Sequence, residues 1–145
     1  MFEKILMPSD GSTHAIKAAG YCADVAKKYN AAVTLLYVVE IPPVMGIPAS
    51  EDMQHQMQTE LASRGRRALD ATRKVFSQRG LGIEEELAFG SAVPYILNYA
   101  AQCKFDLIVI GSRGAGTGAI EQILIGSVAE GILHGAPCPV LMIRP

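Results

Sequence analysis

The residues of this sequence best suited to chemistry form a glycine-rich stretch near its C-terminal end. Four glycines fall between Gly111 and Gly118, directly after an apolar run, and Gly126 and Ser127 follow at the start of a helical pattern. Residues without a side chain let backbone N–H groups come close to a ligand. A helix N-terminus adds unpaired N–H donors and the positive end of the helix dipole. The stretch therefore predicts a binding site for an anion such as phosphate.

Strand-like and helical segments alternate along the chain, which is typical of β-α-β units around a parallel sheet. Strands are predicted at 4–7, 32–39, 83–87, 105–110 and 139–143, and helices at about 12–29, 50–79, 91–101 and 126–134. The apolar runs at 32–39 and 105–110 fit central strands, whereas the acidic 83–87 fits an edge. We therefore predict an α/β fold: an open, twisted, five-stranded parallel sheet of order 3-2-1-4-5 with helices on both faces, Rossmann-like in architecture.

Local signals also predict how the helices begin, end and pack. Ser12 or Asp10 is the expected N-cap of the first helix, and Ser91 that of the third. Gly135 is the expected left-handed stop of the last helix. Met53 and Met57 lie one helical turn apart, and we interpret them as ordinary packing residues in preference to a soft ligand-contact surface.

In an open parallel sheet, ligands bind beyond the carboxyl ends of the strands, where the strand order reverses. Three segments are expected to meet there: residues 8–12 after the first strand, 38–40 after the second, and the loop from Gly111 after the fourth. The proline-rich connection at 40–48 is the longest irregular segment, and it is a candidate lid over this crevice.

Composition limits the class of protein. The chain has 145 residues, of which 50% are hydrophobic, so we expect one domain, residues 1–145, with a full core. The net charge of -1 offers no basic field for nucleic acid or an anionic membrane. No apolar run approaches a signal peptide or the ~20 residues of a membrane span, so we expect a cytoplasmic protein.

The remaining reactive side chains do not form a catalytic or metal-binding pattern. Three cysteines lie far apart and are expected to be reduced core thiols, and three histidines share no metal-ligand spacing. The phosphate-loop lysine motif and the nucleophile elbow are both missing. The acids and the lysine that a phosphoacceptor receiver domain needs after the third and fifth strands are also missing. We therefore predict no catalytic residue and no protein metal ligand.

Four motifs, in order along the whole chain, resemble the universal stress protein family. They are 5–12 (ILMPSDGS), 35–39 (LLYVV), 106–114 (DLIVIGSRG), and 126–128 (GSV) with 137–141 (PCPVL). ATP-binding members carry a glycine, two residues, a glycine, nine residues, and then glycine with Ser or Thr. Gly111, Gly114, Gly126 and Ser127 match these types. Eleven residues separate Gly114 from Gly126, whereas nine separate Gly116 from Gly126, which indicates a two-residue insertion in the loop.

The resemblance implies a role for each candidate site residue. Asp10 would lie near ribose and adenine with Pro8 and Ser9 shaping that wall, and the Val38 backbone would bind the adenine edge. Phosphates would be bound by the loop (Gly111, Ser112, Arg113, Gly114 and Gly116) and by the helix start (Gly126, Ser127 and Val128). Plainer alternatives stay open: Asp10 and Ser127 as helix caps only, and Arg113 as a solvated loop charge.

The resemblance also implies a function and partners. The cofactor would be ATP, or ADP or AMP, with Mg²⁺ held through the phosphates and water. The apolar strand at 139–143 would form a homodimer, which agrees with the tendency of an exposed edge strand to pair. We predict a nucleotide-binding regulatory module for stress response. The alternatives are a slow ATPase that uses the same crevice, or a protein interaction module with a vestigial site.

Overall fold

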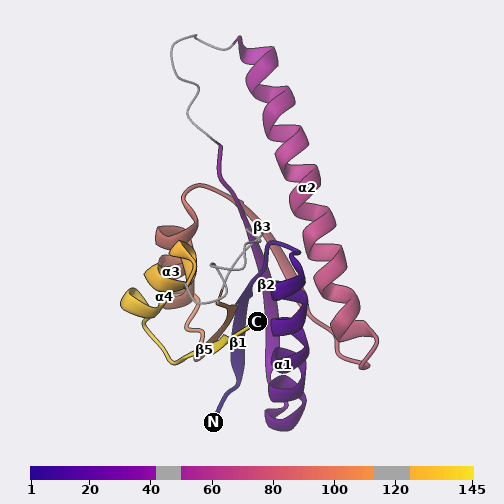
Figure 1. The fold of residues 1–145 in the computed structure, drawn as a ribbon, viewed down its shortest axis with the longest axis vertical. Coiled ribbons are helices and arrows are strands. Elements are labelled where there is room, and N and C mark those ends of the chain that lie inside the picture. Colours follow the sequence, from indigo (N-terminus) through magenta and orange to yellow (C-terminus); the bar gives the residue numbers. More distant parts are fainter. Residues whose placement is uncertain (42–49, 113–124) are drawn as a thin grey trace.

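The computed structural model describes residues 1–41, 50–112 and 125–145, and Figure 1 shows their arrangement. The strands pair in parallel in the order β3-β2-β1-β4-β5, so the predicted sheet topology is confirmed. The strands are β1 (Lys4–Pro8), β2 (Ala32–Val39), β3 (Glu84–Phe89), β4 (Leu107–Gly111) and β5 (Val140–Ile143). The helices are α1 (Thr13–Tyr29), α2 (Glu51–Ser77), α3 (Ala92–Gln102) and α4 (Ser127–Gly135).

Residue type decides the position of each strand in the sheet. Residues 5–7 of β1 and 107–110 of β4 are buried, because helices cover both faces of these central strands. The acidic β3 lies at one edge and β5 at the other, as predicted. Asp106 joins the two central strands, since its carboxylate accepts hydrogen bonds from Glu3 N at 2.8 Å and Lys4 N at 3.1 Å.

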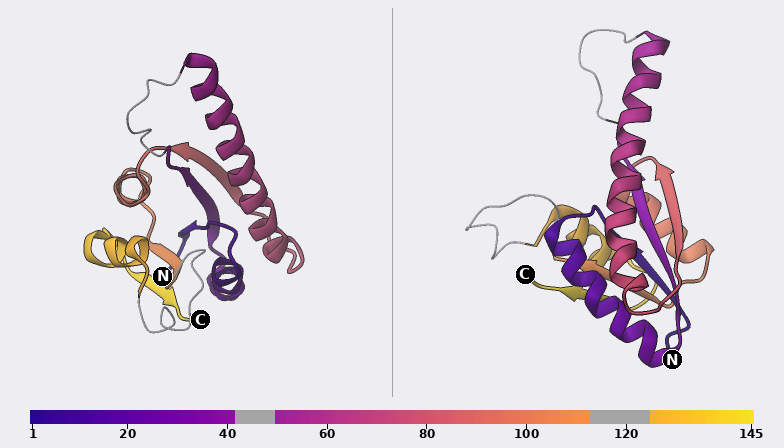
Figure 2. Two further views of the ribbon diagram at one scale, coloured as in Figure 1. Left: turned by 45° about the horizontal axis from the view of Figure 1, so that its top comes forward. Right: turned by 90° about the vertical axis from the view of Figure 1, so that its right-hand side faces the viewer.

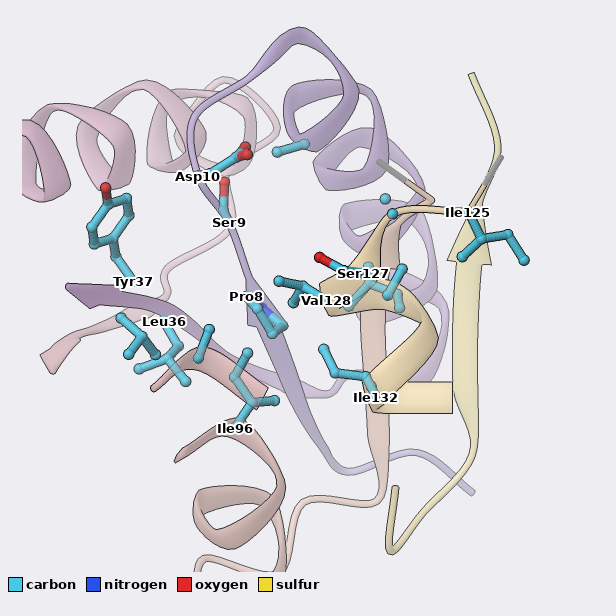
Figure 3. Close-up of a pocket in the computed structure, with 17 residues that line it drawn as sticks. Pro8, Ser9, Asp10, Leu36, Tyr37, Ile96, Ile125, Ser127, Val128 and Ile132 are labelled. Atoms are coloured by element: carbon cyan, nitrogen blue, oxygen red, sulfur yellow. The ribbon is translucent and has the colours of Figure 1, made fainter. Parts of the chain in front are cut away.

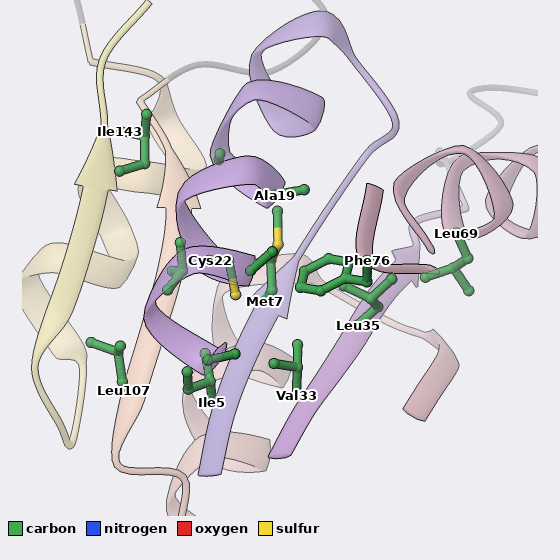
Figure 4. Packing of buried hydrophobic residues seen from close by; sticks show 14 residues of the cluster. Ile5, Met7, Ala19, Cys22, Val33, Leu35, Leu69, Phe76, Leu107 and Ile143 are labelled. Carbon is green, nitrogen blue, oxygen red and sulfur yellow. The ribbon is translucent and has the colours of Figure 1, made fainter. Parts of the chain in front are cut away.

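Helices cover both faces of the sheet, as predicted. In the left view of Figure 2 the sheet separates α1 and α2 from α3 and α4. On the first face, α1 presents a stripe of small buried residues that lets it lie close to β1 and β4 (Figure 4). That stripe consists of Ala15, Ala18, Ala19, Cys22, Ala23 and Ala26. On the second face, α3 and α4 pack through residues such as Ile96 and Ile132.

The cysteines are all free thiols. Cys22 lies in the core between α1 and the sheet, as predicted, whereas Cys103 and Cys138 are half-buried against the core of the other face. Burial raises the pKa of the Cys22 thiol from 9.0 to about 12. The thiolate is the reactive form of cysteine, so Cys22 is chemically inert at neutral pH.

Two local predictions were wrong. Gly135 does not end α4 in a left-handed conformation; it lies inside the helix, and Ala136 follows it with a φ of -61°. Glycine fits there because it has no Cβ; a Cβ at this position would lie 2.6 Å from Leu97 Cδ1 of α3. Met53 is 62% exposed, and Met57 is only partly buried. The first turns of α2 extend past the end of the sheet (Figure 1), beyond the core that the described residues form.

No helix in the described part of the chain is long and apolar enough to cross a membrane.

Candidate functional site

A cavity of about 490 Å³ lies beyond the carboxyl ends of β1, β2 and β4, beside the start of α4. This is the place predicted from the reversal of strand order between β1 and its two neighbours. The cavity volume falls within the range of small-molecule sites in proteins. The sequence-predicted residues that line it are Pro8, Ser9, Asp10, Val38, Gly111, Gly126, Ser127 and Val128. Figure 3 shows Asp10 and Ser127 on opposite walls of this cavity.

The remaining predicted site residues either do not line the cavity or lie outside the part of the chain that the structure describes. Ser112 is buried behind the cavity and does not line it. Its backbone N–H donates to Ile143 O at 2.9 Å and its carbonyl accepts from Gly126 N at 2.7 Å, so it joins the end of β4 to β5 and to the start of α4. Arg113, Gly114 and Gly116 lie outside the described residues, as does most of the predicted lid at 40–48.

The start of α4 faces the cavity without a cap from a described side chain. Gly126 occupies the N-cap position, where it has no side chain to accept a hydrogen bond. The helical hydrogen bonds start with Glu130 N, which donates to Gly126 O at 2.9 Å. The amides of Ser127, Val128 and Ala129 precede that bond, and all three residues line the cavity. An anion placed there meets three N–H donors and the positive end of the helix dipole.

The start of α3 also borders the cavity, but the protein supplies its own anion there. Glu40 Oε1 accepts a hydrogen bond from Ala92 N at 2.6 Å, although Glu40 follows β2 and lies far from α3 in sequence. Ser91 occupies the N-cap position, as predicted, yet its hydroxyl makes no capping hydrogen bond. The expected capping by the Ser91 side chain is therefore replaced by the carboxylate of Glu40, which directly follows β2.

The wall opposite α4 is formed by the turn after β1. Ser12 caps α1, since its Oγ accepts from Ala15 N at 3.2 Å. Asp10 Oδ1 accepts from Ser12 N at 2.9 Å, so Asp10 supports the cap without being the cap itself. The Asp10 carboxylate is exposed and lines the cavity, and its hydrogen bond to the Ser12 amide uses only Oδ1. A carboxylate oxygen in this position can accept a hydrogen bond from a ligand hydroxyl.

Between the two polar walls, the cavity has an apolar floor. Leu36 and Val38 come from β2, Ile96 from α3, and Ile132 from α4, and the labelled side chains among them point toward the centre in Figure 3. A flat apolar ring system fits such a surface, because ligand pockets combine hydrophobic walls with a few placed polar groups.

The sequence analysis did not name Leu36, Ile96 or Ile132 as site residues. It placed the segment 38–40 at the crevice but did not predict that Glu40 caps α3. The available signal was position: Leu36 lies near the carboxyl end of its strand, and Ile96 lies in the second turn of α3. Both places face the predicted crevice. No group of three or more His, Cys, Asp or Glu residues that could hold a metal ion occurs within residues 1–41, 50–112 and 125–145.

Comparison with known proteins agrees with this geometry. The universal stress protein family matches residues 1–144 of the chain. The universal stress protein MJ0531 of Methanocaldococcus jannaschii is 37% identical over 144 residues, which cover 99% of this chain and 83% of that protein. The structure of the universal stress protein UspA from Lactobacillus plantarum has a TM-score of 0.79 at 28% identity, with 99% of this chain and 98% of that chain covered. The chain belongs to the universal stress protein family.

Two more distant structures share the fold and contain nucleotides. A universal stress protein in complex with cAMP has a TM-score of 0.72 at 21% identity, with 99% of this chain and 97% of that chain covered. A universal stress protein family member from Arabidopsis thaliana with AMP bound has a TM-score of 0.68 at 18% identity, with 98% and 91% covered.

Proposed function

We propose that this chain, as a single domain over residues 1–145, binds ATP and acts as a regulatory module in stress response. The observation that carries the proposal is the start of α4. Three residues whose amides precede the first helical hydrogen bond line the cavity there, and no described side chain caps the helix. An adenine nucleotide matches the cavity, because it combines an apolar ring, a ribose with hydroxyls and an anionic tail. The AMP and cAMP complexes of proteins with this fold support the same ligand class.

Each part of the nucleotide has a proposed partner. Adenine lies on the apolar floor of Leu36 and Ile96, with its edge at the Val38 backbone. The ribose hydroxyls bind Asp10, and Pro8 and Ser9 shape that wall. The phosphates bind two groups of residues. The first is the glycine loop of Gly111, Arg113, Gly114 and Gly116, in which the buried Ser112 joins the loop to β5 and α4 and does not bind the ligand. The second is the helix start of Gly126, Ser127 and Val128. Mg²⁺ would be held through the phosphates and water.

We also propose that the protein is a cytoplasmic homodimer that pairs through strand 139–143. Val140, Leu141 and Met142 are only partly buried, and β5 lies at the edge of the sheet. An apolar edge strand with unpaired backbone groups favours pairing with a second chain. Light scattering at micromolar concentration should give twice the chain mass of 15.5 kDa, and a monomer mass would contradict the proposal.

The experiment for the nucleotide itself is calorimetry with ATP, ADP, AMP and adenosine at constant ionic strength. We expect the affinity to increase with the number of phosphates, because each added phosphate gains contacts at α4 and in the glycine loop. Denaturation of the purified protein should release a nucleotide that chromatography identifies. No released nucleotide, together with no binding at millimolar ATP, would overturn the proposal.

A further inference from the structure

A buried pair of hydroxyl groups links the Asp10 wall of the cavity to α2. Ser9 Oγ and Thr72 Oγ1 lie 2.7 Å apart, although 63 positions separate them in sequence. Ser9 is 8% exposed and Thr72 is fully buried. Thr72 does not line the cavity, so any influence it has on a ligand passes through Ser9.

The hydrogen bonds of this pair form a chain with one direction. Thr72 Oγ1 donates its proton to Ala68 O at 2.8 Å, and a carbonyl oxygen can only accept. Ser9 must therefore donate its own proton to Thr72 Oγ1. Ser9 Oγ in turn accepts from Gly11 N at 3.2 Å. The chain starts at an amide of the turn after β1 and ends at a carbonyl of α2, and each hydroxyl donates once and accepts once.

Close packing fixes the same turn against α2. Gly11 has a φ of 75°, and a Cβ at that residue would lie 2.8 Å from both Cα and Cβ of Ala68. Ser9 N also donates to Leu36 O of β2 at 2.9 Å. Asp10 lies between these two anchored residues. Its backbone is therefore set by contacts with α2 and β2, whereas its carboxylate faces the cavity.

We propose that Thr72 is a positioning residue that sets the preference of the site for a ligand with ribose hydroxyls. This inference rests on the proposed function. The Thr72 hydroxyl holds Ser9, Ser9 holds Gly11, and the two together fix the Asp10 carboxylate where it accepts hydrogen bonds from the ribose. Without the Thr72 hydroxyl, the Ser9 proton loses its buried acceptor, and Ser9 must rotate toward another one. The turn that carries Asp10 then shifts.

The test compares ATP with 2′,3′-dideoxyATP by calorimetry in the full chain. In the wild type we expect ATP to bind about tenfold more tightly, which is the size of a hydrogen bond to a charged group. In Thr72→Val, which keeps the shape and removes the hydroxyl, we expect this preference to fall to less than about twofold. The affinity for 2′,3′-dideoxyATP should stay within about twofold of the wild type, because the adenine and phosphate contacts do not involve Thr72.

Two further variants separate positioning from general packing. Thr72→Ser restores the hydroxyl and should restore the preference for ATP. Ser9→Ala removes the same link from the other side while Thr72 keeps its bond to Ala68 O, so it should lose the preference even if Thr72→Val fails to fold. Thermal unfolding of each variant checks the fold.

The outcomes distinguish the inference from the proposed function. The positioning role would be overturned if Thr72→Val weakened the binding of ATP and of 2′,3′-dideoxyATP equally. It would also be overturned if Ser9→Ala kept the wild-type preference for ATP. A wild type that binds both nucleotides equally would also overturn it and leave the proposed function standing. A wild type that binds neither nucleotide would overturn both.

Discussion

The starts of α3 and α4 border the same cavity, but the chain treats them in opposite ways. At α3 the Glu40 carboxylate accepts from Ala92 N, so the helix dipole already has an anion. At α4 the N-cap is Gly126, and no described side chain caps the helix. A glycine at the N-cap costs roughly a few tenths of a kcal/mol relative to a residue whose side chain caps the helix. We infer that the protein accepts this cost at α4 because a ligand phosphate takes the place of the cap.

The variant with the largest expected effect gives the start of α4 a carboxylate, as the start of α3 already has. Gly126→Asp places a carboxylate at the N-cap, where the φ of -63° is open to any residue. We expect the ATP affinity to fall about a hundredfold, because the carboxylate repels the phosphates and occupies their donors. The free energy of unfolding should rise by a few tenths of a kcal/mol, because Asp caps a helix better than Gly. Calorimetry and urea denaturation measure the two effects.

Gly126→Asn is the matched control, because Asn caps a helix without a charge. It should give a similar gain in stability and lose less than about tenfold in ATP affinity. Equal losses of affinity in the Asp and Asn variants would mean that side-chain volume at Gly126, and not charge, excludes the nucleotide.

A second test moves α4 away from α3. A Cβ at Gly131 would lie 2.8 Å from Val93 Cγ1 and 2.9 Å from Cγ2, and a β-branched side chain has little freedom to move. We expect Gly131→Ala to lower the free energy of unfolding by about 1 to 2 kcal/mol. It should also weaken ATP binding several-fold, because the α4 amides are displaced. Urea denaturation and calorimetry test this expectation.

Gly135→Ala serves as the comparison for that variant. Its Cβ would meet Leu97 Cδ1, the end of a flexible side chain that can adopt another rotamer. The higher helix propensity of alanine also offsets part of the crowding. We expect a change within about 0.5 kcal/mol. A Gly135→Ala variant less stable than Gly131→Ala would show that the contact with Val93 does not fix the position of α4.

The smallest expected effect comes from removing the cap of α3. Glu40→Ala should lower the free energy of unfolding by about 0.5 to 1 kcal/mol, since the Ala92 amide loses its acceptor at an exposed position. Glu40→Gln keeps an acceptor oxygen, so its free energy of unfolding should fall by less. Both variants should bind ATP within about twofold of the wild type. Loss of ATP binding in Glu40→Gln would show that the start of α3 belongs to the nucleotide site.

The sequence predicted the features that depend on local patterns. Alternation of strands and helices predicted the parallel sheet, and the apolar or acidic character of the strands predicted which lie at its centre and edge. The position of Asp10 after the first strand and of Gly126 at a helix start placed both at the cavity. Features that depend on distant residues could not be predicted in this way. Glu40 caps a helix that begins 52 positions later, and Thr72 contacts a residue 63 positions earlier. Met53 follows the helical pattern of α2, but periodicity does not reveal that the first turns of this helix extend past the end of the sheet and leave Met53 exposed.

The most direct measurement is a titration of the ¹⁵N-labelled protein followed by the backbone amide resonances of Ser127, Val128 and Ala129. We predict that ATP shifts these three resonances strongly and that adenosine shifts them little, whereas the Ala92 amide, already bound to Glu40, stays nearly unchanged with both ligands. If saturating ATP leaves Ser127, Val128 and Ala129 where adenosine leaves them, the start of α4 does not bind the phosphates, and the account is wrong.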